Sequence, residues 1–244
     1  MNGPMAPPLP LHLLRLVSQS LPVGAFSYSR GLEAAVHAGW VHDETTTRDW
    51  IFGTLEHSYA VFDGALFLRM MAALERSDRA GFAALDAWLA AGRESRELQQ
   101  EDRRMGEAML RLLADLEVPL ARELAREYVA ARPGQPPCPG GSPRGGLSWT
   151  AAFAIAAWHW RIPATQALSG LIWSAAEAQV AAAIRLVPLG HTAGQRILIA
   201  APEMITRAVA RAGDAGDDEI GNVSVALAMA SAWHENQYSR LFRS

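Results

Sequence analysis

The amino-acid sequence predicts an all-α protein, a single-domain bundle of about ten helices. Apolar residues recur at the helical period along most of the chain, and no convincing run of alternating β-branched residues indicates a sheet. Alanine, leucine, arginine and glutamate, which all favour helices, dominate the composition. A chain of 244 residues, 50% of them hydrophobic, can bury a large core as one domain.

The first half of the chain carries helix start and stop signals in a regular order. Asp43 and Asp78 each stand where a carboxylate can cap the first turn of a helix, and Gly39 stands where a helix can end. With boundaries good to a few residues, the expected helices are about 9–18, 28–38, 44–60, 62–76, 79–91, 93–116 and 118–131.

A Pro- and Gly-rich stretch, residues 133–146, interrupts this pattern. We expect a flexible surface loop or a hinge between two helical halves, and we attach no function to it. Beyond it Ser148 can cap a helix, Pro163 suits a first helical turn, and Pro188 ends the helix before it. The expected helices there are about 148–161, 164–186, 191–211 and 222–234.

Composition excludes several classes of function. A net charge of −3 is small and of the wrong sign for a nucleic-acid binder. The N-terminal prolines do not fit a signal peptide, and the apolar stretch 164–187 contains charged and amide side chains, so we expect a buried helix rather than a membrane span. The single cysteine, Cys138, allows no internal disulfide, which favours a cytoplasmic protein.

The common catalytic motifs are missing from the sequence. There is no P-loop, HExxH, CxxC or GxSxG pattern, and the seven histidines are scattered. These absences give no sign of a nucleotide, cofactor or metal site. The alternative is an all-helical enzyme with a polar pocket around His159, Glu177 and His191.

The segment 93–104, RESRELQQEDRR, is densely charged. Pairs such as Arg93 with Glu97, and Glu97 with Arg104, lie within or near helical reach of one another. The favoured interpretation is a solvated helix face with weak ion pairs, and a charged docking face is the alternative.

Three stretches have the composition of a contact surface. Residues 21–35 form a turn with two aromatic side chains, either packed in the core or presented to a partner. Residues 184–198 form either a buried hinge or a groove for another chain segment. The tail, 235–244, interleaves apolar and arginine side chains; if it is helical, Tyr238, Leu241 and Phe242 share one face. A segment this short cannot hold a helix alone in water, so we expect the tail to dock on its own body or on a partner.

Four segments together resemble the urease accessory protein UreF family. They are LPVGAFSYSRGLEAAVHAGWV, RESRELQQEDRRMGEAM, IRLVPLGHTAGQRIL and the terminal HENQYSRLFRS, and they follow the family's order along almost the whole chain. The terminal motif is highly specific.

The resemblance implies an all-α, non-catalytic adaptor. Members of the family form homodimers, bind UreD (called UreH in some organisms), recruit the GTPase UreG, and act on apo-urease during nickel insertion, with nickel handled by the complex rather than held as a cofactor. It also implies that Arg240 lies against the loop around Phe26 and bonds its backbone carbonyls. The implied partner-binding residues are Phe26, Tyr28, Glu33, Arg185, Gln195, Arg196, His234, Glu235, Tyr238, Ser239, Arg240, Leu241, Phe242 and Arg243.

Overall fold

The computed structural model describes residues 10–130, 146–221 and 224–244. Every regular element in these residues is a helix, and no strand occurs among them, which confirms the all-α prediction. The expected loop at 133–146, with Cys138, lies outside the described residues except for Gly146. The assignment of the chain to a single domain stays a prediction.

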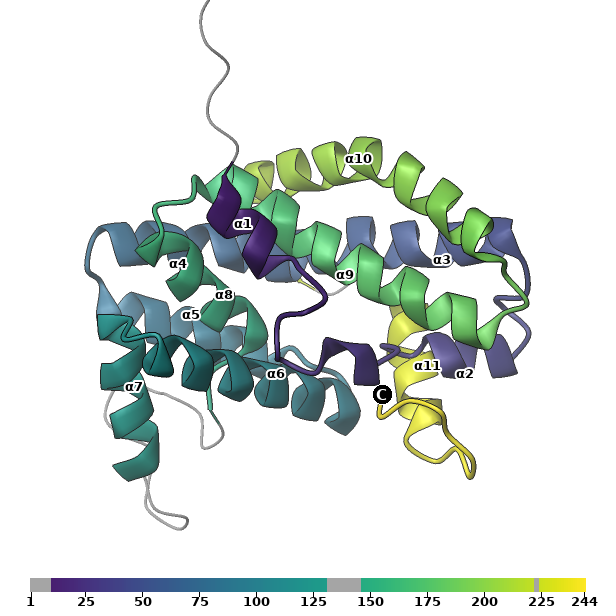
Figure 1. The fold of residues 1–244 in the computed structure, drawn as a ribbon, viewed down its shortest axis with the longest axis horizontal. Coiled ribbons are helices and arrows are strands. Elements are labelled where there is room, and N and C mark those ends of the chain that lie inside the picture. The colour runs from purple at the N-terminus through teal and green to yellow at the C-terminus, as the bar shows by residue number, and fades with distance from the viewer. Residues whose placement is uncertain (1–9, 131–145, 222–223) are drawn as a thin grey trace, which may run out of the picture.

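One helix, α8 (Trp149–His159), is enclosed by other helices of the bundle (Figure 1). Its residues 149–157 are all buried, and a helix that is apolar on every side belongs in a core. The amphipathic helix α6 (Arg96–Asp115) packs on α8 along one side, and α4 (Ala65–Glu75) packs on the other. Gly106 allows the first contact, because a Cβ there would lie 1.9 Å from the carbonyl oxygen of Leu147.

Two long helices, α9 (Ala164–Leu186) and α10 (His191–Asp214), form a hairpin along one edge of the bundle (Figure 1). α9 is the described helix that is long and apolar enough to cross a membrane, but 56% of its apolar window is buried in this bundle. It packs against α10, α8 and the helical segment of residues 55–64. The prediction of a buried helix at 164–186, ended by Pro188, is therefore confirmed in its bounds and packing.

One helical rod differs from the sequence prediction. The pattern predicts a break between helices at 44–60 and 62–76, but α3 (Glu44–Thr54), a π-helical stretch η2 (Leu55–Gly64) and α4 are continuous. The predicted separation was wrong because the hydrogen bonds of a π-helix join residues i and i+5, which shifts the stripe of apolar residues along the helix surface. A search for the α-helical period of 3.6 residues reads that shift as the end of a helix. Asp43 caps the rod, accepting the Thr46 N–H at 2.8 Å, as expected.

The remaining helices follow the predicted order: α5 has the predicted bounds, and the other four begin one to four residues later than expected. They are α1 (Leu11–Leu16), α2 (Leu32–His37), α5 (Arg79–Ala91), α7 (Pro119–Ala130) and α11 (Val225–His234), with a 3-10 turn η1 (Ala25–Ser27) between α1 and α2. α2 starts four residues later than expected because Arg30 and Gly31 have φ values of 51° and 76°, which no right-handed helix contains. Gly31 also lies close to α11, because a Cβ added at this position would be only 3.2 Å from the backbone nitrogen of Ser231.

Candidate functional site

The loop from α1 to α2 separates its two aromatic side chains. Gly24 adopts the left-handed conformation, with φ 77°, and begins the short turn η1. Phe26, on that turn, is 76% exposed, whereas Tyr28, in extended backbone two residues later, is buried. The sequence left open whether both rings are in the core or both face a partner, and the structure places one in each position.

The C-terminal tail, residues 235–244, folds back from α11 across α2 and this loop, near the C label of Figure 1. The backbone N–H groups of Leu241 and Phe242 donate to the two carboxylate oxygens of Glu33, at 2.7 and 2.8 Å. The Arg243 N–H donates to the carbonyl of Ser27 at 2.9 Å. The tail therefore docks on its own body, one of the outcomes that the sequence allows, and it does so without forming a helix.

A set of charged groups, the tail cluster, fixes the start of this path, and all of its members except Arg240 are buried. It comprises Glu33 of α2, Glu97 of α6, His234 at the end of α11, and Arg240. His234 is fully buried, with Nδ1 2.6 Å from Glu97 and Nε2 3.2 Å from Glu33. The Arg240 guanidinium donates to the other oxygen of Glu97. The tail cluster therefore joins α2, α6, the end of α11 and the tail through side-chain hydrogen bonds.

Further contacts seal the end of the tail. Phe242 is buried, and the guanidinium of Arg185 lies over its ring, 4.7 Å from the centroid. The hydroxyl of Ser244 donates to Glu101 at 2.6 Å, and Arg30 pairs with the same carboxylate at 3.2 Å. Burial raises the pKa of Glu101, and these two partners work against that rise.

The predicted role of Arg240 is wrong in its geometry. The guanidinium pairs with Glu97, and the bond to a loop carbonyl comes instead from the backbone N–H of Arg243. The condition under which Tyr238, Leu241 and Phe242 would share one face is not met, because the tail is not helical: Tyr238 and Leu241 face solvent while Phe242 is buried.

The structure divides the predicted partner-binding residues into three groups. The first group lies on or near the tail surface and is exposed or half-buried: Phe26, Arg185, Glu235, Tyr238, Ser239, Arg240, Leu241 and Arg243. Buried residues that support them are Tyr28, Glu33, His234 and Phe242. The third group is Gln195 and Arg196, which are exposed on a different element, α10. Arg196 forms two hydrogen bonds there with Glu44 of α3.

Glu235 has a role that the sequence did not indicate. Its carboxylate accepts the backbone N–H groups of Arg96 at 2.6 Å and Glu97 at 3.3 Å. These donors belong to the first turn of α6, whose N-H groups have no partner within the helix. The first residue of the tail therefore completes the N-terminal end of α6 and joins the tail to the bundle.

The favoured interpretation of segment 93–104 as a solvated face is wrong at four positions. Arg93, Glu97, Glu101 and Asp102 are all buried. Their partners lie on other elements, so the expected pairing of Arg93 with Glu97 does not form. The misleading feature was the density of charge, whereas Glu97 and Glu101, four residues apart, mark one inward-facing stripe of α6.

The second buried set, the body cluster, comprises Arg93, Asp63, Asp102 and Thr150. The Arg93 guanidinium lies 2.9 Å from Asp63 and 3.3 Å from Asp102, and the Thr150 hydroxyl donates to Asp63 at 3.1 Å. Burial works to lower the pKa of Arg93, but Asp102 and Asp63 outweigh it, and the pKa is raised. Asp63 lies in the π-helical stretch, so this cluster joins η2, α6 and α8.

The three residues of the alternative enzyme pocket do not converge. His159 lines one cavity, at the end of α8, with Arg161. Glu177 lines a different cavity, where burial raises its pKa, and His191 is exposed and lines neither. Within the described ranges, no three His, Cys, Asp or Glu side chains are grouped so that they could hold a metal ion.

Fold and site together define an all-α protein with an ordered C-terminal segment folded across one end of its bundle. The chain belongs to the UreF family: the family's sequence model matches residues 41–201. It is 60% identical to the urease accessory protein UreF 2 of Brucella anthropi, over 98% of both chains. It is 43% identical to the urease accessory protein UreF of Azoarcus sp., over 97% of this chain and 96% of that one.

Proposed function

We propose that this chain is a non-catalytic adaptor in the maturation of urease in the cytoplasm. In this role it forms a homodimer, binds UreD (or UreH), recruits the GTPase UreG and acts on apo-urease. The adaptor couples GTP hydrolysis by UreG to nickel insertion, and nickel is the cargo of the assembly rather than a resident cofactor. Membership of a family of urease accessory proteins supports the general role.

The observation that carries this proposal is the ordered tail and what it presents. The buried carboxylate of Glu33 holds the tail backbone, while Tyr238, Leu241 and Phe26, on the loop that the tail crosses, remain exposed. Exposed apolar side chains on a rigid support, rimmed by arginines, are typical of residues that dominate binding energy at protein interfaces. The recruitment surface for UreG is therefore assigned to Phe26, Leu241 and Tyr238, with Arg185, Arg240 and Arg243 at its rim.

A pair of matched substitutions tests this assignment. Phe26 is 76% exposed and Ile199, on α10, is 77% exposed, so neither change removes core packing. Phe26→Ala is expected to weaken recruitment of UreG to the UreD-bound chain by about tenfold, because a central aromatic contact is lost. Ile199→Ala is expected to leave recruitment unchanged. Size-exclusion chromatography with light scattering and a titration of UreG measure both.

A truncation extends the test to the whole tail. A chain without residues 235–244 is expected to bind no UreG, and circular dichroism reports whether its helices persist. Recruitment that survives both the truncation and Phe26→Ala contradicts the proposed surface.

A further inference from the structure

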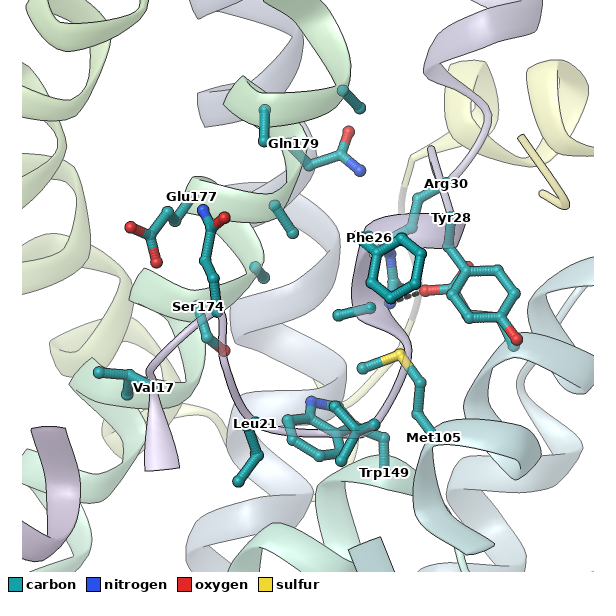
Figure 2. A pocket seen from close by; sticks show the side chains of 18 of the residues that line it. Val17, Leu21, Phe26, Tyr28, Arg30, Met105, Trp149, Ser174, Glu177 and Gln179 are labelled. Carbon is teal, nitrogen blue, oxygen red and sulfur yellow. Dashed lines mark hydrogen bonds and ion pairs between the residues drawn. The ribbon is translucent and has the colours of Figure 1, made fainter. Parts of the chain in front are cut away.

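A cavity lies beneath the loop between α1 and α2, against α9, α6 and α8 (Figure 2). Its volume is about 230 Å³, and most of its wall is apolar, with Leu21, Val23, Met105 and Trp149 among the lining residues. An apolar cavity of about 150 Å³ can hold benzene, whereas drug-sized ligands need about 300 Å³ or more. The cavity therefore has room for a single aromatic ring with a short substituent.

Four charged side chains line this mostly apolar cavity: Arg30, Glu101, Glu177 and Arg185. Arg30 lines the cavity, its side chain is 21% exposed, and the ring of Tyr59 lies 5.3 Å from its guanidinium carbon. A guanidinium carries five N–H donors. Among the described residues its one hydrogen-bond partner is Glu101, at 3.2 Å. Donors therefore remain for a ligand that can accept hydrogen bonds.

The backbone and the charge distribution favour an anionic ligand at this end. Arg30 has a φ of 51°, an uncommon conformation for a residue with a side chain, and it brings the guanidinium to the cavity. Glu101 is already bonded to both Arg30 and Ser244. The other lining carboxylate, Glu177, lies across the cavity and points away from Arg30 in Figure 2. Arg185 adds a second positive charge at the rim, beside Phe242.

We propose that this cavity binds a small aromatic monocarboxylate, with the ring against Trp149 and Met105 and the carboxylate on Arg30. A planar carboxylate matches the fork of a guanidinium, and such charge-assisted bonds strengthen in an apolar enclosure. A cation would face two arginines, while Glu101 is already bonded to Arg30 and Ser244. A doubly charged phosphate would be repelled by Glu101 more strongly than a monocarboxylate. The site goes beyond the adaptor function and does not depend on it, because the isolated chain contains every group involved.

Isothermal titration of the purified full chain with phenylacetate tests the site, with phenylacetamide as the neutral control of the same shape. Saturable binding of one phenylacetate per chain is expected, with phenylacetamide at least tenfold weaker. No saturable binding of phenylacetate overturns the proposal. Equal affinity for the two compounds also overturns it, because the guanidinium would then play no part.

Three variants locate the site. Ala178→Leu fills the half-buried wall of α9 and is expected to abolish binding while the melting temperature is kept or raised. Arg30→Gln combined with Glu101→Gln, which leaves no unpaired buried carboxylate, is expected to remove the preference for the acid. Arg207→Gln, at an exposed ion pair with Glu56 on α10 and η2, is the control and should bind like the unchanged chain. Binding by Ala178→Leu at full affinity places the ligand elsewhere and overturns the assignment.

Discussion

The body cluster and the tail cluster use the same helix, α6, for different purposes. Asp102 turns toward Arg93 and Asp63, and it joins segments that are already held by the apolar core. Glu97, one and a half turns earlier, turns toward His234 and Arg240, and it holds a segment that has little core of its own. Similar buried ion pairs can thus secure a fold in one place and position a surface segment in another. The difference predicts which substitutions unfold the chain and which only release the tail.

The largest effect is expected from Asp63→Ala. This change leaves the buried Arg93 with Asp102 alone and removes the acceptor of Thr150. Loss of one partner of a buried ion pair lowers the free energy of unfolding by about 3–5 kcal/mol. Urea denaturation followed by circular dichroism measures the loss, and a loss below about 1 kcal/mol would remove the distinction between the two clusters.

Glu33→Ala tests the tail cluster and should have a smaller effect on the fold. It removes the acceptor of the Leu241 and Phe242 N–H groups and one partner of His234. We expect a loss of about 2–3 kcal/mol, because unmade buried hydrogen bonds cost about 1–3 kcal/mol. Hydrogen exchange should become fast in residues 238–244 while α8 stays protected. Equal loss of protection in α8 would contradict a separate role for the tail cluster.

Asp86 sharpens the comparison because it is a buried carboxyl without a close cation. It accepts the Ser148 N–H at 3.1 Å, and burial raises its pKa from 3.8 to about 6. The folded state therefore binds this proton more tightly than the unfolded state, so the Asp86 contribution to stability is full below about pH 4 and is lost as the pH rises through about 6.

Asp86→Asn keeps an oxygen for Ser148 and cannot ionise. Relative to the unchanged chain, we expect it to be more stable at pH 7.5, by on the order of 2 kcal/mol, and equally stable near pH 4. Urea denaturation at both pH values, on both chains, isolates this group from the others that titrate. A difference that is independent of pH would contradict the raised pKa.

The smallest effect is expected from Arg196→Ala on α10. Its ion pair with Glu44 is exposed on both sides, and such pairs contribute little. The denaturation midpoint and the recruitment of UreG should both be unchanged. Weakened recruitment would return Arg196 to the partner surface, where the sequence interpretation placed it.

The sequence predicted the helices well because their signals are local. Caps at Asp43, Asp78 and Ser148 are all formed as expected, and the bounds of α9 agree closely. The π-helical stretch could not be predicted, because its i→i+5 turns are selected by packing and not by residue type.

The surface was predicted only in part, because the missing information is long-range. The motif identified the tail and Glu33, and the structure brings them together. It could not show that Arg240 pairs with Glu97, since that contact joins residues 143 apart in the chain. The buried charges at Arg93, Glu97, Glu101 and Asp102 were predicted to be exposed for the same reason. A local sequence pattern does not show partners that are distant in the chain, such as Asp63.

The π-helical stretch makes residues 55–64 the part of this rod in which chain length can change most easily. Each of its turns encloses one residue more than an α-helical turn, so removal of one residue would let the rod continue as an α-helix without a break in hydrogen bonding. Removal of one residue from α4 itself, which is regular, would instead rotate the residues on its two sides by about 100° relative to each other. Buried side chains such as Phe67 and Met70 would then turn away from α8. A chain one residue shorter can therefore keep this fold if the missing residue falls within 55–64, whereas a deletion in α4 needs a compensating insertion in the same rod.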